Sequence, residues 1–333
     1  MTNTPAGSVP SLPGERCWTL YGLVITTPHR FGNRLVETEA PADLWIRPVD
    51  AAPLAPGWET VAPGYRSPAM IDDLQHFLDV IRVGDVTVFR FTEVVDFFVL
   101  DDGIAYQLHD PAYDYMVELH LLGFVLAYWL ERAGWPALHA SSVVVDGSAI
   151  AFLSNHGGGK TSLAATMLRL GYPLGSDDIV ALTRAAGGFL ARPGYPQMRM
   201  WPEQANYFVG HDALERVHPG LTKRRVPVAA GEFGTFDGAP RPLTALYLPT
   251  RRDGGDITFE TMPPSQALFQ LVRHTFLVGI VEGAGLASQR FATLAEVVRR
   301  VPLRVVRYPN GLDLLPEVAE RVADDARALV RGD

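Results

Sequence analysis

The chain has 333 residues, of which 47% are hydrophobic, and its formal net charge is −8. A chain of this length can bury a substantial core, and its length predicts about two domains. Its acidic balance gives no electrostatic attraction to nucleic acid or to anionic membranes, so we expect neither as a partner.

The compartment is indicated by the cysteine content and by the apolar runs. Cys17 is the single cysteine, so no internal disulfide can form. The segment Met1–Arg16 is polar and lacks the apolar core of a signal peptide. The longest apolar run, Leu121–Leu130, has about half the length that a membrane span needs. These features predict a cytoplasmic protein.

The first 110 residues are rich in predicted strands. Runs of β-branched and aromatic residues predict strands at Trp18–Thr26, Leu44–Arg47, Val86–Thr92, Val94–Leu100 and Ile104–Leu108. The last three form an antiparallel meander. A short helix is expected at Ile71–Ile81. Residues 1–110 are therefore predicted to be a small β-rich module that helps to select a substrate.

Residues 111–333 mix helices with strands, which predicts an α/β catalytic domain. A long helix is expected from Asp110 to Arg132, because Pro111 suits a first helical turn. The later elements are a hairpin, a short helix from Trp201, three strands and three helices. They are expected at Ile179–Leu182 with Phe189–Arg192, then at Leu243–Leu248, Ile257–Thr261, Ser265–Val278, Phe291–Val301, Leu303–Arg307 and Leu315–Val330.

A glycine-rich turn between a strand and a helix carries the strongest chemical signal. The sequence reads Ala151-Phe-Leu-Ser-Asn-His-Gly-Gly-Gly-Lys-Thr-Ser162, and a helix-like segment follows to Leu170. Backbone N–H groups of such a turn, with the positive end of the helix, form a cradle for phosphate oxygens. Ser154 replaces the first glycine of the usual pattern.

Each residue of this turn has a predicted role. The phosphate-binding residues are Asn155, His156, Gly157, Gly158, Gly159, Lys160, Thr161 and Ser162. Lys160 supplies charge to the outer phosphates, and the Thr161 hydroxyl joins the coordination shell of Mg²⁺. His156 contacts phosphate or the acceptor, or is a tolerated spacer. Alternatively, the whole segment is a solvated glycine turn with no role in binding.

An acidic pair follows the helix. Gly171 is a good left-handed cap, and the extended run Tyr172–Ser176 ends at Asp177 and Asp178. A strand pairing beside the loop strand would bring both carboxylates close to Thr161 and the metal. One carboxylate can then hold Mg²⁺ while the other accepts the proton of an attacking hydroxyl. An Asp-Asp pair can also be a solvated turn.

Five further residues bear on the predicted site. His139 precedes a buried strand, so it is either a satisfied core residue or a group aimed at the transferred phosphate. Lys223 and Arg225 either reach phosphate oxygens or form a solvated basic turn. Arg199 and His274 lie in apolar stretches and are expected to be structural.

The chain resembles the C-terminal catalytic domain of HPr kinase/phosphorylase and its relatives. The resemblance is carried by Leu138-His139-Ala-Ser-Ser-Val-Val-Val145, the Asp146-Gly147 turn, the loop at 154–162 and Gly171-Tyr-Pro-Leu-Gly-Ser-Asp-Asp178. It implies a P-loop fold and serine-kinase activity, with Asp177 as base, Asp178 as metal ligand and His139 near the transferred phosphate. The family's glutamate-arginine-glycine signature is replaced by Pro196-Gln-Met-Arg-Met-Trp-Pro202.

This departure makes the chain similar to the HPr-kinase-related branch, which includes kinases of lasso-peptide precursors, rather than to the regulator of sugar uptake. The implied function is phosphotransfer from ATP, with Mg²⁺, to a serine of a peptide or small protein. ATP is preferred to GTP because the sequence has no guanine-selecting motif. A small-molecule kinase and a nucleotide-dependent switch are the alternatives. The acceptor, reverse phosphorolysis and homo-oligomerisation are left open.

Overall fold

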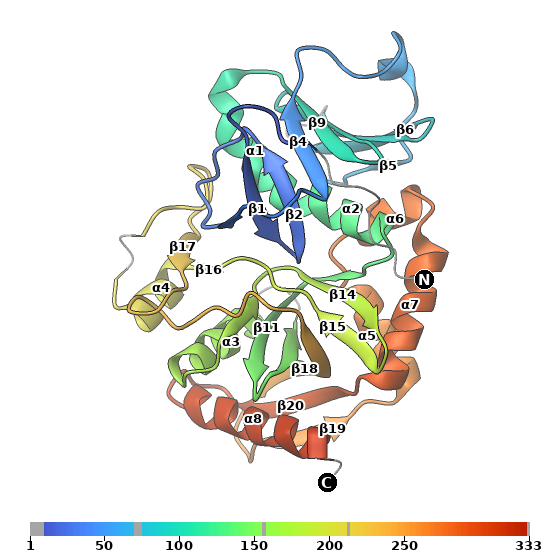
Figure 1. Cartoon of the computed structure of the whole chain (residues 1–333). Helices are drawn as coiled ribbons and strands as arrows, with labels where there is room; N and C mark the ends of the chain where they lie inside the picture. The colour runs from blue at the N-terminus through green and yellow to red at the C-terminus, as the bar shows by residue number, and fades with distance from the viewer. Residues whose placement is uncertain (1–9, 70–74, 155–157, 212–213, 332–333) are drawn as a thin grey trace. The chain divides into compact units, whose positions relative to one another are not determined.

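The computed structural model describes residues 10–69, 75–154, 158–211 and 214–331 of a mixed α/β protein (Figure 1). The chain divides into two compact units. Unit 1 comprises Met1–Gly134 and Leu277–Arg290, and unit 2 comprises Trp135–Phe276 and Phe291–Asp333.

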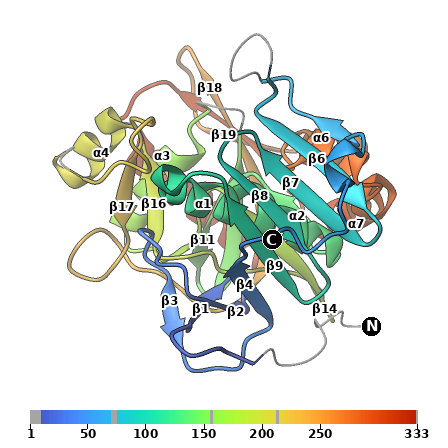
Figure 2. The same cartoon turned by 90° about the horizontal axis from the view of Figure 1, so that it is seen from above.

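Unit 1 is built on a nine-stranded sheet with the order β3-β1-β2-β4-β9-β8-β7-β6-β5. Its strands are β1 (Arg16–Leu20), β2 (Leu23–Thr27), β3 (Val36–Thr38), β4 (Leu44–Pro48), β5 (Tyr65–Arg66), β6 (Leu78–Val83), β7 (Val86–Phe91), β8 (Val95–Val99) and β9 (Gly103–Leu108). Figure 2 shows β7, β8 and β9 side by side. The predicted antiparallel meander is confirmed.

Two predictions in unit 1 are wrong. The run Trp18–Thr26 is a hairpin rather than one strand, because Tyr21 and Gly22 adopt left-handed φ angles of 52° and 70° and reverse the chain. The helix expected at 71–81 is replaced at its end by β6, which pairs along its whole length with β7. Leu78, Val80 and Ile81 are buried there, so sheet pairing overrides the helical pattern. Residues 70–74 lie outside the described residues.

The helix expected from Asp110 to Arg132 is present with altered geometry inside. A 3₁₀ turn (Pro111–Tyr113) leads into α1 (Asp114–His120), a π-helical stretch (Leu121–Val125) and α2 (Leu126–Arg132). The Asp110 carboxylate caps its start by accepting from the Ala112 N–H at 2.8 Å. This helical segment belongs to unit 1, so the boundary predicted at 110 differs from the observed division. The segment packs against the strands that precede it, with the ring of His120 stacked on that of Phe91 at 3.7 Å between centres.

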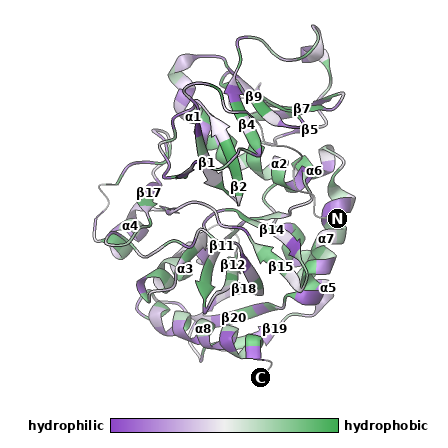
Figure 3. Cartoon of the chain, viewed as in Figure 1, coloured by the Kyte–Doolittle hydropathy of each residue, from purple (hydrophilic) through white to green (hydrophobic). Residues whose placement is uncertain are grey.

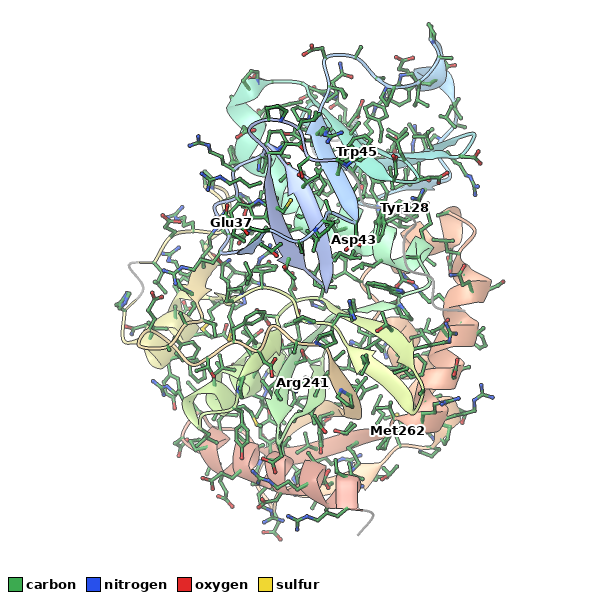
Figure 4. All side chains as sticks on the ribbon, viewed as in Figure 1. Glu37, Asp43, Trp45, Tyr128, Arg241 and Met262 are labelled. Atoms are coloured by element: carbon green, nitrogen blue, oxygen red, sulfur yellow. The ribbon has the colours of Figure 1, made fainter. Side chains whose placement is uncertain are left out.

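Side-chain packing in unit 1 depends on one close approach. A Cβ on Gly103 would lie 1.9 Å from the ring of Trp45, which is labelled in Figure 4. Only glycine lets the indole cross β9 at this point. Tyr128, also labelled, bonds Thr87 through its hydroxyl at 2.9 Å and so ties α2 to β7.

Unit 2 contains a sheet with the order β10-β14-β15-β18-β12-β11-β13, to which β20 and β19 are added beside β18. The strands are β10 (Ala137–Leu138), β11 (Ala140–Val145), β12 (Ser148–Leu153), β13 (Leu174–Ser176), β14 (Val180–Ala185), β15 (Gly188–Ala191), β18 (Arg241–Arg252), β19 (Thr258–Thr261) and β20 (Leu303–Pro309). A separate ribbon pairs β16 (Gln197–Met200) with β17 (Arg224–Pro227).

The helices were only partly predicted. They are α3 (Lys160–Arg169), α4 (Pro202–Val209), α5 (Pro264–Arg273), α6 (Val278–Gly283), α7 (Ala287–Arg300) and α8 (Leu315–Arg331). The helix expected at 265–278 ends at Arg273, because Thr275 bridges to Leu138 and the Phe276 N–H bonds the Ala137 carbonyl. None of the helices in the described part of the chain has both the length and the apolar composition that a membrane span needs.

The sheet of unit 2 is covered on both faces. Along β12, Ile150 and Phe152 enter one core with residues of α3 and α8, whereas Ala149, Ala151 and Leu153 enter another core with residues of α5 and α7. This alternation is the period of two expected for a strand. Figure 3 shows the apolar character of these central strands against the mixed character of α8.

Tyr247→Phe is expected to lower the free energy of unfolding by about 1.5–3 kcal/mol. The fully buried Tyr247 donates its hydroxyl to Asp325 of α8 at 2.8 Å, and Asp325 also pairs with Arg304. Urea unfolding measures the change, with exposed Tyr113→Phe as the matched control. Equal stability of the two variants would contradict this assignment.

Candidate active site

The ends of three strands of unit 2 meet at one edge of the sheet. The sequence places β13 beside the loop strand, but the structure corrects this: β13 pairs with β11, and β11 pairs with β12. Both pairings are antiparallel, so β12 and β13 run in the same direction. Their carboxyl ends therefore lie at the edge where β11 begins, directly after His139. Strand β11 separates the two, yet Asp177 and the loop still face the same edge.

The expected strand and helix flank the glycine-rich segment. Strand β12 ends at Leu153 and α3 begins at Lys160. Gly159 precedes the helix with a φ of 97°, which is a left-handed conformation that side chains disfavour. A Cβ there would also meet the Tyr308 hydroxyl at 3.2 Å. The predicted ligands Asn155, His156 and Gly157 lie outside the described residues.

A pocket of about 220 Å³ opens at the start of α3. Its walls come from five segments of unit 2. They are Ser154, Gly158, Gly159, Lys160, Thr161, Ser162, Arg199, Trp201, Gln204, Lys223, Arg251 and Leu312. Lys160, Arg199, Lys223 and Arg251 are basic, so the pocket concentrates positive charge beside the helix N-terminus. This environment suits a ligand with several anionic groups.

Lys160 and His139 contact each other at this edge. The Lys160 ammonium lies 2.9 Å from Nε2 of His139, and Nδ1 of His139 lies 3.0 Å from the carbonyl oxygen of Asp178. Burial lowers the pKa of His139, and Lys160 lowers it further against the opposing Asp178. A neutral imidazole protonated on Nδ1 fits both contacts, because Nε2 then accepts from Lys160 while Nδ1–H donates to the carbonyl.

Burial also lowers the pKa of the Lys160 ammonium, although Asp177 and Asp178 oppose this effect. The sequence left two interpretations of His139 open. The structure brings His139 directly to Lys160, at 2.9 Å.

Asp178 presents its carboxylate to Arg199 and His139. Oδ2 lies 3.3 Å from Nη1 of Arg199, and Oδ1 lies 3.3 Å from Nδ1 of His139. Burial alone would raise the pKa of Asp178, but Arg199, with the other nearby cations, brings it below its ordinary value. Its φ of 73° is left-handed, a conformation that Asp and Asn tolerate better than most residues. Asp178 is therefore ionised at neutral pH and is held beside the pocket cations.

Asp177 is oriented differently and is more deeply buried, with 7% of its surface exposed. Its Oδ1 accepts from the Ser141 hydroxyl at 2.6 Å, and its Oδ2 accepts from the backbone N–H of Arg199 at 3.0 Å. The carboxylate of Asp177 thus contacts β11 and β16, whereas that of Asp178 contacts side chains of the charged cluster.

The two predicted basic residues at the start of β17, Lys223 just before it and Arg225 within it, take different positions. Lys223 lines the pocket, and its ammonium lies 5.2 Å from the ring centre of Trp201. Arg225 donates to the Val217 carbonyl at 2.8 Å and does not belong to the pocket lining found among the described residues.

Several pocket residues were not predicted from the sequence. Arg199 was expected to be structural, and Arg251, Trp201, Gln204 and Leu312 were not considered. Arg251 lies at the carboxyl end of β18, which runs parallel to the loop strand, so knowledge of this pairing would have indicated it. His274 keeps a structural position: its carbonyl accepts from the His139 N–H at 2.7 Å, and burial lowers its pKa to about 4.

Gly159→Ala is expected to lower the free energy of unfolding by about 1–3 kcal/mol and to weaken binding of the nucleotide that the sequence predicts as ligand about tenfold or more. Alanine strains the left-handed backbone and meets Tyr308, which displaces the start of α3. Urea unfolding and calorimetry with an ATP analogue measure the two effects. Gly187→Ala, in an open turn, is the matched control. If both variants had the same stability and the same affinity for the analogue, the assignment of Gly159 to a phosphate-binding turn would be contradicted.

Comparison with known proteins finds similarity among solved structures. No family model matches the chain, and no curated protein does. Among solved structures, the chain is similar to the Hpr(Ser) kinase/phosphatase from Coxiella burnetii, at 12% sequence identity and a TM-score of 0.30. The similarity covers 59% of this chain and 98% of that chain. At this TM-score, function has to be argued from the site itself.

Proposed function

We propose that the chain is an ATP- and Mg²⁺-dependent kinase that transfers the γ-phosphoryl group to a serine hydroxyl of a peptide or small protein, including a ribosomally made precursor peptide. One observation carries the proposal: four basic side chains surround the start of α3 in a single pocket, directly after a glycine-rich turn. The polyphosphate of a nucleotide is a ligand whose charge fits this pocket.

The pocket residues divide into groups by the part of ATP that they would bind. Gly158, Gly159 and the first N–H groups of α3 form the cradle for phosphate oxygens. Lys160 supplies charge at the outer phosphates, once a phosphate competes with His139 for its ammonium. Arg199 and Arg251 add guanidinium groups, which match phosphate oxygens in geometry.

Oxygen ligands for Mg²⁺ are also present at this edge. Thr161, which carries a hydroxyl, lines the pocket, and Asp178 supplies an ionised carboxylate beside the pocket residue Arg199. Mg²⁺ sites of this kind use one or two protein oxygens together with substrate phosphates. When bound, the ion neutralises charge on the phosphates during transfer.

The reaction is an in-line displacement. The serine oxygen forms a bond to the γ-phosphorus while the bond to the bridging oxygen breaks, and ADP leaves with that electron pair. The serine proton passes to a carboxylate of the aspartate pair. Basic side chains around the pocket stabilise the negative charge that spreads over the transferring group.

Incubation of the intact protein with ATP and Mg²⁺, in the presence of serine-containing peptides, tests the proposal. Mass spectrometry should find a phosphate on serine in a peptide, and it should not form when Mg²⁺ is chelated. Two results would contradict the proposal and favour another function. Free serine phosphorylated as efficiently as every peptide would indicate a small-molecule kinase, and nucleotide binding without transfer to any acceptor would indicate a switch.

A further inference from the structure

The two adjacent aspartates have separate environments. Asp177 is nearly excluded from solvent, and each of its oxygens accepts a hydrogen bond from the fold. Asp178, with a side chain 24% exposed, faces Arg199 and His139. The carboxylates of the two adjacent residues therefore contact different groups.

Asp177 is bonded to the backbone of β16 through Arg199. Arg199 lies on β16, outside the main sheet, and its backbone N–H donates to Asp177 at 3.0 Å. Its guanidinium continues past this anchor to Asp178 and lines the pocket. Asp177 thus ties the strand that carries the pocket arginine to the edge of the catalytic sheet.

The segments that flank Asp177 and lead to β16 pack closely against each other. Gly194, on the segment leading to β16, donates to the Gly175 carbonyl at 2.8 Å, and a Cβ on Gly194 would lie 2.3 Å from Ser176 Oγ. A Cβ on Gly175 would lie 2.8 Å from Ser142 Oγ. The backbones of β11, β13 and this segment are therefore as close as glycine allows. Turning Asp177 toward an acceptor would leave the Arg199 N–H and the Ser141 hydroxyl unsatisfied.

We infer that Asp177 is a positioning residue that holds Arg199 at the pocket, and that Asp178 is the carboxylate of the pair that meets the nucleotide, the metal and the acceptor. The inference rests on the proposed function. It reverses the role that the sequence resemblance implies for Asp177, because that role needs a carboxylate open to the acceptor hydroxyl.

Two substitutions at Asp177 separate positioning from proton transfer. The amide of Asp177→Asn can still accept from the Arg199 N–H through its oxygen and can donate to the Ser141 oxygen through its NH₂ group. It cannot act as the base. Asp177→Ala loses both hydrogen bonds. A positioning role therefore survives in the Asn variant and is lost in the Ala variant, whereas a base role is lost in both.

The measurements are calorimetric binding of the Mg²⁺ complex of AMP-PNP and the rate of ADP formation from ATP with Mg²⁺. We expect Asp177→Asn to stay within about threefold of the wild type in both. Asp177→Ala should weaken analogue binding about tenfold, as Arg199→Ala does. The double variant Asp177→Ala/Arg199→Ala should bind no more weakly than Arg199→Ala alone, because both changes remove the same interaction.

Three results would overturn the inference. The first is an Asp177→Asn variant that binds the analogue normally but turns over more than about 100-fold more slowly, which identifies Asp177 as the proton acceptor. The second is additive losses in the double variant. The third is an Asp177→Ala variant with unchanged binding and turnover.

Failure of the proposed function gives a different result. In that case the wild type itself neither binds the AMP-PNP complex nor forms ADP. Circular dichroism checks that each variant is folded. If Asp177→Ala does not fold, turnover of the near-isosteric Asn variant still decides between the two roles.

Discussion

Lys160→Ala is expected to lower kcat for phosphoryl transfer at least about 100-fold while the protein stays folded. The ammonium lies in the pocket at the start of α3, and its contact is with the polar His139 ring rather than with an apolar core. In the proposed reaction its charge would stabilise the transferring phosphoryl group, and losing it should cost roughly 3 kcal/mol in the transition state. Steady-state kinetics with ATP and Mg²⁺ measure the effect.

The matched control removes a cation that lies elsewhere in unit 2. Arg184→Ala breaks an ion pair with Glu296 on a half-exposed surface and should leave kcat near the wild-type value. A Lys160→Ala variant that keeps more than about a tenth of the wild-type kcat would count against the phosphate-binding assignment. Thermal unfolding of both variants shows whether any loss comes from the fold.

Asp178→Asn is expected to lower kcat by about 100-fold to 1,000-fold and to raise the Mg²⁺ concentration needed for half-maximal activity. The substitution removes the ionised carboxylate that faces the pocket cations. Asparagine tolerates the left-handed φ of 73°, so the backbone should keep its conformation. A titration of activity with Mg²⁺ at saturating ATP separates the two effects.

Asp146→Asn is the matched control. Asp146 also has a left-handed φ, of 46°, and its carboxylate pairs with Arg327 away from the pocket. This variant should keep both kcat and the Mg²⁺ requirement. If Asp178→Asn shifts neither quantity while Asp177→Asn shifts both, the roles of the two aspartates are the reverse of those inferred above.

Local sequence patterns correctly predicted the elements that are stabilised by residues close to them in the sequence. The meander from Val86 to Leu108 follows from alternating apolar residues and tight turns. Helix α8 follows from its period, and it is observed at Leu315–Arg331. The strand and helix on either side of the glycine-rich turn are also where the sequence places them. In each case the hydrogen bonds that define the element join residues close in sequence.

Contacts between residues far apart in the sequence determine the division into units, the strand at residues 78–81 and the strand order, none of which local patterns predict. Residues Leu277–Arg290 belong to unit 1, although they follow 142 residues of unit 2 (135 to 276). Residues 78–81 are strand because β7 pairs with them. Strand β11 lies between β12 and β13. The backbone of a strand can pair along either edge, so only the assembled sheet sets this order.

The candidate site also combines residues that local patterns identify with residues that only the tertiary structure brings together. Lys160, Thr161 and the aspartate pair are identifiable from residue type and spacing, because one strand–turn–helix segment and its successor supply them all. Arg199, Lys223 and Arg251 come from three other strands or loops, and only folding brings them to the same pocket. The environments of Asp177 and Asp178 are likewise set by β11, β16 and His139, because the backbone bends after β13 and the two side chains meet different neighbours that only the tertiary structure places there.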